Sequence, residues 1–148
     1  GGNKLNLYEN GTKIFNPGIT GSTNTWRYYA ISRVSSVIYI YEGGTLIVSG
    51  SNSTNITDSS SNFYIGCENP ALPTSDAWPG NITNFRFIKG TGLYNTSTIA
   101  VPTKPLKNVL NTKLLLRAGS SNNFLYDSSI YNKTATNSGT TFSTLTPF

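Results

Sequence analysis

The side chains that could take part in catalysis are few in this chain. Its 148 residues include no histidine, which excludes Ser-His-Asp and Cys-His catalysis, histidine-ligated zinc and any imidazole proton relay. A glycosidase needs two carboxylates on opposite sides of the scissile bond. The carboxylates lie far apart in the sequence, at Glu9, Glu42, Asp58, Glu68, Asp76 and Asp127. The sequence therefore predicts a protein that is not an enzyme, with Asp127 as a turn or capping residue in the segment Tyr-Asp-Ser-Ser.

The loop of residues 68–81 holds the side chains that sugar-binding sites use. Such sites pair an aromatic ring, on which the apolar face of a pyranose stacks, with amides and carboxylates that reach its hydroxyl groups. Three prolines in the loop would keep it stiff and lower the entropy lost on binding. We predict glycan binding with Trp78 as the stacking platform and Glu68, Asp76 and Asn81 as hydroxyl partners.

A second interpretation of Trp78 stays open. Tryptophan is rarely left fully exposed, so Trp78 would then be a plug that covers the edge of a sheet. Trp26, in contrast, alternates with Tyr28 and Ala30, a period typical of a strand, and is expected in the core.

The apolar pattern has a period of two along almost the whole chain, and Asn, Ser and Thr are abundant, which suits strands and turns. The Asn10-Gly11 pair predicts an opening hairpin, and Gly43-Gly44 predicts a second tight turn. Residues 49–61 are expected as an exposed loop and residues 95–107, with Pro102 and Pro105, as a connection without a central strand. Strands are expected over residues 5–8, 12–15, 25–34, 37–41, 45–48, 63–66, 85–88 and 113–117, the last buried on both faces. These elements predict one domain over residues 1–148, with two packed antiparallel sheets.

Three motifs occur in a recognisable order: F-Y-I-G at residues 63–66, G-N-I-T-N-F-R-F at residues 80–87, and Lys89-Gly90 followed by Tyr94. This order resembles the closing half of laminin G-like and pentraxin-like modules of the concanavalin A-like lectin and glucanase superfamily. The resemblance implies an all-β jelly-roll sandwich, with residues 95–107 wrapping along it. Several such modules bind calcium, for which Glu68 and Asp76 could supply ligands. The acidic pair that often follows the family's G-x-I is replaced here by Thr83 and Asn84. We therefore expect no cofactor.

Residues 113–148 resemble the opening of a laminin G-like repeat more than its end. Either the chain is cut from a tandem array within a repeat, or its last strands complete the same sandwich. We favour the second arrangement, because a fragment without its first strands would expose unpaired sheet edges. It predicts that residues 114–116 pair in the sheet that also holds the first hairpin.

The eleven Lys and Arg residues are scattered singly, and no stretch reaches the ~20 apolar residues of a membrane span. We therefore expect neither a nucleic acid nor a membrane as partner. Similar modules occur in surface proteins of large algal DNA viruses and phages, where they contact host glycans. The resemblance implies an attachment module of an extracellular or virion-surface protein that binds a glycan or cell-wall polysaccharide. The alternative is a structural oligomerisation or decoration module without glycan binding. In either case we expect a homo-oligomer, a trimer first, through an exposed face of residues 37–41.

Overall fold

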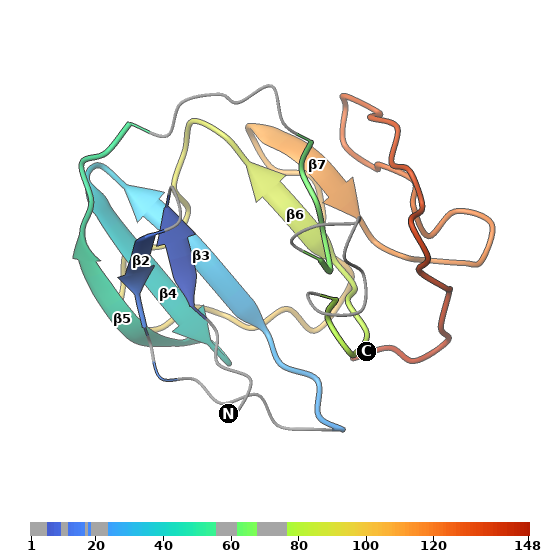
Figure 1. Cartoon of the computed structure of the whole chain (residues 1–148), viewed down its shortest axis with the longest axis horizontal. Helices are drawn as coiled ribbons and strands as arrows, with labels where there is room; N and C mark the ends of the chain where they lie inside the picture. The colour runs from blue at the N-terminus through green and yellow to red at the C-terminus, as the bar shows by residue number, and fades with distance from the viewer. Residues whose placement is uncertain (1–5, 10–11, 17, 19–23, 56–61, 68–76) are drawn as a thin grey trace. The chain divides into compact units, whose positions relative to one another are not determined.

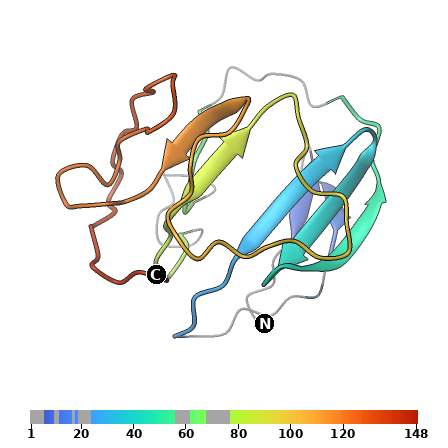
Figure 2. The same ribbon diagram turned by 180° about the vertical axis from the view of Figure 1, so that it is seen from behind.

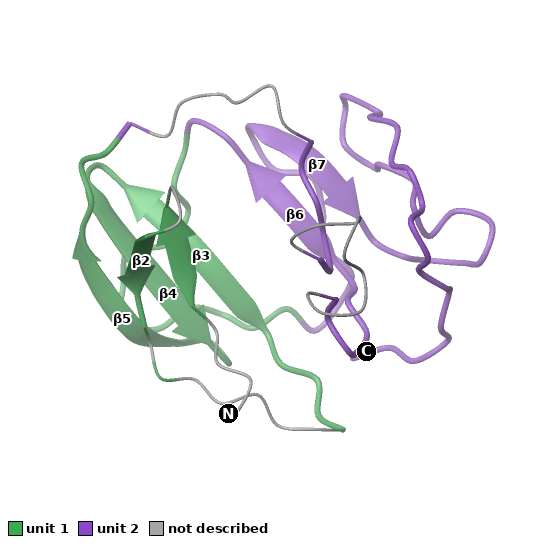
Figure 3. Cartoon of the chain, in the orientation of Figure 1, with its two compact units in different colours: residues 1–54, 91–102 green, residues 55–90, 103–148 purple. Residues whose placement is uncertain are grey.

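A computed structural model of the chain describes residues 6–9, 12–16, 18, 24–55, 62–67 and 77–148. These residues belong to two compact units, one of residues 1–54 and 91–102 and the other of residues 55–90 and 103–148 (Figure 3). The described part of the chain contains no helix. Its strands are β1 (Leu7–Glu9), β2 (Thr12–Phe15), β3 (Tyr29–Val34), β4 (Val37–Glu42), β5 (Thr45–Ser51), β6 (Phe85–Ile88) and β7 (Thr112–Leu116) (Figure 1). All pairings between them are antiparallel, which confirms the prediction of an all-β antiparallel protein.

Unit 1 is built on the three-stranded sheet β3-β4-β5. The hairpin between β4 and β5 closes with Glu42 paired to Thr45, so Gly43 and Gly44 form a two-residue turn. Their φ angles are 55° and 85°, and two positive φ angles are what a type I′ hairpin turn requires. Glycine adopts these angles without a Cβ clash, which explains why this predicted hairpin forms where the sequence places it.

One face of this sheet is covered by the β1–β2 hairpin, which lies in front of it in Figure 1. The Phe15 ring of β2 approaches Gly50 of β5 so closely that a Cβ there would lie 2.7 Å from the ring. Asn52 adds a hydrogen bond of 3.0 Å to the Glu9 carboxylate at the end of β1. Ile38 and Ile40 of β4 are buried, with 5% and 1% of their surface exposed.

The opposite face is covered by residues 91–102, which cross it in the reverse view of Figure 2. The Tyr94 ring meets the Tyr41 ring edge-on, with centroids 6.0 Å apart. The Tyr41 hydroxyl donates to the Thr96 carbonyl at 2.9 Å, and the Tyr94 amide donates to Ser32 Oγ at 3.0 Å. Tyr41 is fully buried, and this burial raises the pKa of its hydroxyl. The wrapping connection without a central strand, predicted for residues 95–107, is thus seen here as far as Pro102.

Because both faces of β4 are covered, the predicted oligomer interface on residues 37–41 is wrong: Ile38, Ile40 and Tyr41 are core residues of unit 1.

Two further predictions need correction. β3 starts at Tyr29, because its partner β4 ends at Glu42 opposite it, and Trp26 therefore precedes the strand with 36% of its surface exposed. β5 continues to Ser51, since Val37 supplies a partner for that residue.

Unit 2 contains the β6–β7 pair, in which Phe85 lies opposite Leu116 and Phe87 opposite Leu114. β7 thus pairs with β6, its nearest strand in the chain, and not with the first hairpin as predicted. It is also not buried on both faces: Leu115 is 1% exposed, whereas Leu114 and Leu116 are half-buried. Residues 63–66 form no strand, although the Phe63 ring packs on β6, with centroids 5.7 Å from Phe85 and 5.8 Å from Phe87.

Candidate functional site

The predicted sugar-binding loop is closed at its base by two backbone contacts in unit 2. Cys67 and Ala77 form an isolated antiparallel bridge, and the Trp78 amide donates to the Gly66 carbonyl at 2.6 Å. Gly66 has a φ of +87°, a conformation that disfavours any residue with a side chain. The backbone on both sides of the loop is therefore held together. Of the predicted site residues, Glu68 and Asp76 lie outside the described residues.

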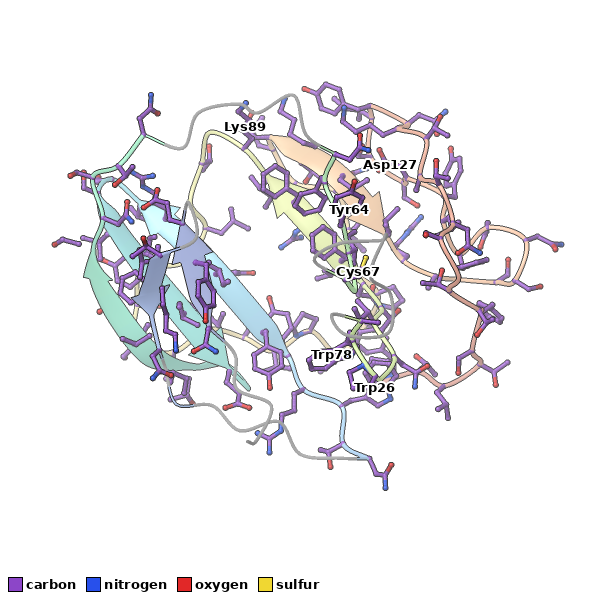
Figure 4. The ribbon with its side chains drawn as sticks, viewed as in Figure 1. Trp26, Tyr64, Cys67, Trp78, Lys89 and Asp127 are labelled. Atoms are coloured by element: carbon purple, nitrogen blue, oxygen red, sulfur yellow. The ribbon has the colours of Figure 1, made fainter. Side chains whose placement is uncertain are left out.

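The Trp78 side chain is half-exposed, with 51% of its surface open to solvent. Its indole lies against the backbone of Gly80, where a Cβ would stand 2.9 Å from Nε1. Asn81 follows on the same loop and is exposed. The structure therefore places a half-exposed indole and an exposed amide within four residues of chain. Figure 4 shows Trp78 together with Cys67 at the base of the loop.

Asp127, predicted to be a turn or capping residue, is fully buried in unit 2 and takes that role (Figure 4). Oδ1 accepts hydrogen bonds from the amides of Leu115 and Ser129 at 2.9 and 2.8 Å. Oδ2 accepts from the Ser129 hydroxyl and from the Lys133 amide, each at 2.8 Å. Burial by itself would raise the pKa of this carboxyl, but the four hydrogen bonds together lower it below its ordinary value. A carboxylate whose oxygens are occupied in this way is a structural group.

A cluster that the sequence did not reveal lies next to this carboxylate. Lys113 Nζ donates a hydrogen bond to the Tyr131 hydroxyl and lies 4.2 Å from the centre of its ring. Lys133 Nζ lies 5.9 Å from the same centre. Lys113 is on β7, eighteen residues from Tyr131 in the chain, and no motif or spacing connects them. Only the folding of residues 127–133 back onto β7 brings them together.

Unit 2 also exposes apolar rings beside the loop base. The Phe63 ring is 63% exposed and Phe87 is 44% exposed, although the two rings are in contact. Tyr64, whose hydroxyl accepts a hydrogen bond of 3.4 Å from Asn62, is 42% exposed. The described part of unit 2 therefore offers several aromatic faces to solvent besides Trp78.

Among the described residues, no three His, Cys, Asp or Glu side chains are grouped so that they could hold a metal ion. Nor does the described chain include a helix of the length and apolar character needed to span a membrane. No protein-family model matches the sequence, and comparisons with curated proteins and with solved structures give no significant match either.

Proposed function

We propose that the chain is a carbohydrate-binding or attachment module without catalytic activity, and that it binds its glycan through the Trp78 loop. The observation that carries the proposal is the half-exposed Trp78 ring at the closed base of this loop. A pyranose stacks its apolar face on such a ring, and a ring whose backbone is already fixed loses little entropy on binding.

In this proposal the exposed Asn81 amide binds a hydroxyl group of the stacked sugar. Glu68 and Asp76 supply further hydroxyl contacts from the part of the loop outside the described residues. A single aromatic stack on a shallow surface contributes only on the order of 1 kcal/mol beyond the burial of its area. Binding of one site to one sugar is therefore weak.

The proposed fold is the concanavalin A-like jelly-roll sandwich that the motifs of residues 63–94 suggest, and the antiparallel strands are in keeping with it. The proposed parent is an extracellular or virion-surface protein that displays several copies, because linking weak sites raises avidity by ~10²-fold or more. The competing function is a structural decoration module. The exposed apolar rings of Phe63 and Phe87 favour it, since solvent-facing aromatic contacts also suit packing against another protein.

The test is glycan-array binding by the wild-type chain and by Trp78→Ala. The variant should lose binding to every glycan that the wild type retains, while its free energy of unfolding falls by no more than about 1 kcal/mol, because Trp78 is 51% exposed. Trp26→Ala removes the other tryptophan of the chain, which is 36% exposed, and should leave array binding unchanged.

Two results would contradict the proposal. If the wild-type chain binds no glycan, the structural function is the correct one. If Trp78→Ala costs the ~3 kcal/mol or more typical of a buried tryptophan, the ring is the plug of the alternative interpretation.

A further inference from the structure

Lys113, Tyr131 and Lys133 form a cluster in which two ammonium groups lie near one aromatic ring. Tyr131 is 46% exposed, so the residue keeps surface for a ligand. An ammonium group has three N–H donors, and the hydrogen bond to the Tyr131 hydroxyl uses one donor of Lys113. The other two N–H donors of Lys113 remain for an anionic ligand that lies beside the ring.

The buried Asp127 carboxylate holds the backbone that carries this cluster. It binds the Leu115 amide on β7, two residues after Lys113, and also the Lys133 amide. Ser129, which it fixes through two hydrogen bonds, accepts in turn from the Tyr131 amide at 3.2 Å. One side chain therefore joins the strand that carries the first lysine to the turn that carries the ring and the second lysine.

Cations predominate among the described charged side chains of unit 2. The described residues of unit 2 include a single carboxylate side chain, that of Asp127, which is buried and has both oxygens occupied. They also include the cations Arg86, Lys89, Lys104, Lys107, Lys113, Arg117 and Lys133. The ion pair found in the described chain, Arg27 with Glu42 at 2.7 Å, belongs to unit 1. Within the described part of unit 2, the two lysines of the cluster therefore have no carboxylate as a salt-bridge partner.

We propose that Lys113, Tyr131 and Lys133 bind an acidic pyranose, with the sugar ring on Tyr131 and its carboxylate or sulfate group between the two ammonium groups. The exposed aromatic face selects a sugar over a simple anion, because an inorganic ion gains nothing from an apolar ring. The paired cations select an acidic sugar over a neutral one, because charge-assisted hydrogen bonds are the stronger kind. This site shares no residue with the Trp78 loop and does not depend on glycan binding there.

The experiment titrates the full chain by calorimetry with a galacturonic acid trisaccharide, its methyl ester, and a sulfated galactose trisaccharide. Either the galacturonic acid or the sulfated trisaccharide should bind, and the one that binds more tightly identifies the acidic group that the site recognises. The neutral methyl ester should bind at least tenfold more weakly. Lys113→Gln, Lys133→Gln and Tyr131→Ala should each weaken binding by about tenfold, the loss of one charge-assisted contact or one ring. Lys104→Gln removes the same charge from an exposed lysine elsewhere in unit 2 and should bind like the wild type.

Thermal melts identify any variant that fails to fold. Lys133→Arg keeps the positive charge on an exposed residue and should retain binding. The proposal is overturned if the three cluster variants bind as the wild type does, or if Lys104→Gln loses as much affinity as they do. It is also overturned if polyphosphate or single-stranded DNA of matched charge competes equally well, since the site would then recognise charge alone. Trp78→Ala, tested beside them, separates the two sites: loss of acidic-sugar binding in that variant alone refutes this inference and leaves the Trp78 proposal standing.

Discussion

At the scale of single residues, Asp127 shows how one buried carboxylate can organise the backbone around it. It is fully buried and accepts four hydrogen bonds, three of them from backbone amides of residues 115–133. An unpaired buried charge would be costly, whereas a fully bonded one fixes the backbone groups around it. The side chain therefore takes the place of secondary structure in a segment that has almost none.

We expect Asp127→Asn to destabilise the protein by about 2–4 kcal/mol, because the amide directs N–H groups at donors that need an acceptor. Ser129→Ala removes one of the four hydrogen bonds and also the acceptor of the Tyr131 amide, and it should cost about 1–2 kcal/mol. Urea unfolding followed by fluorescence measures both. Equal losses in the two variants would show that the hydrogen bonds at Asp127 do not contribute separately.

The same carboxylate gives an expected dependence of stability on pH. Burial raises its pKa, but the hydrogen bonds from Lys133, Leu115 and Ser129 together bring the pKa below the ordinary 3.8. The unfolded chain therefore takes up the proton at a higher pH than the folded chain. The contribution of Asp127 is fully present above about pH 4 and is lost as pH falls through its folded pKa. Urea midpoints measured between pH 7 and pH 2.5 should show this loss in the wild type, and Asp127→Asn should lack that part of it.

Residue types in the sequence were enough to place Trp78 and Asn81 in a loop and Asp127 in a turn, but they left open whether Trp78 is exposed or covers the edge of a sheet. They were not enough for the lysine cluster, because Lys113 lies on a strand and Tyr131 in a distant turn. The burial of Trp26 was wrongly predicted for a related reason. Alternation predicts which face a side chain takes only while the strand has a partner, and β4 has ended at that point.

At the scale of elements, Gly92 and Gly44 allow residues 91–102 to lie close to the sheet of unit 1. A Cβ on Gly92 would clash with the Arg33 carbonyl oxygen and lie 2.7 Å from Val34 Cγ2. A Cβ on Gly44 would lie 2.6 Å from the Ile99 carbonyl oxygen. The connection therefore lies backbone against backbone, and it pairs with the start of β5 through the isolated antiparallel bridge between Thr98 and Thr45.

Gly92→Ala should destabilise the protein by about 2–3 kcal/mol, because the added methyl meets a backbone carbonyl that cannot move without distorting β3. The φ of Gly92 is not positive, so the effect is steric and not conformational. Gly119→Ala is the matched control, since its Cβ would make only an ordinary contact of 3.7 Å with Asn123 and its φ is also not positive. Calorimetric melting temperatures compare the two, and a neutral Gly92→Ala would contradict the close approach.

The hairpins were the most predictable elements, since their turn residues and alternating strands are neighbours in the chain. The pairing of β6 with β7 was not predicted. An apolar run such as Leu114 to Leu116 predicts a strand but not which partner the strand has. The segment of residues 63–66 has the composition of a strand, yet it contributes a ring to the face of β6 in place of ladder hydrogen bonds.

At the scale of the whole molecule, we expect a homo-oligomer, with a trimer as the first candidate. Its interface cannot use residues 38, 40 and 41, which are buried in unit 1. Exposed rings such as Phe63 and Phe87 are the better candidates. Light scattering at micromolar concentration should give a multiple of 16.0 kDa, and Phe63→Ser should shift the mass toward that value. A wild-type mass of 16.0 kDa at these concentrations would contradict the expectation.

The two units are interleaved along the chain, because residues 91–102 complete unit 1 after residues 55–90 of unit 2 have been made. During translation, Tyr41 and Ser32 therefore cannot form their hydrogen bonds to Thr96 and Tyr94 until these residues have left the ribosome. No single cut yields two complete halves, so neither unit can be gained, lost or exchanged by one recombination event. The two units must be inherited as one segment of coding sequence.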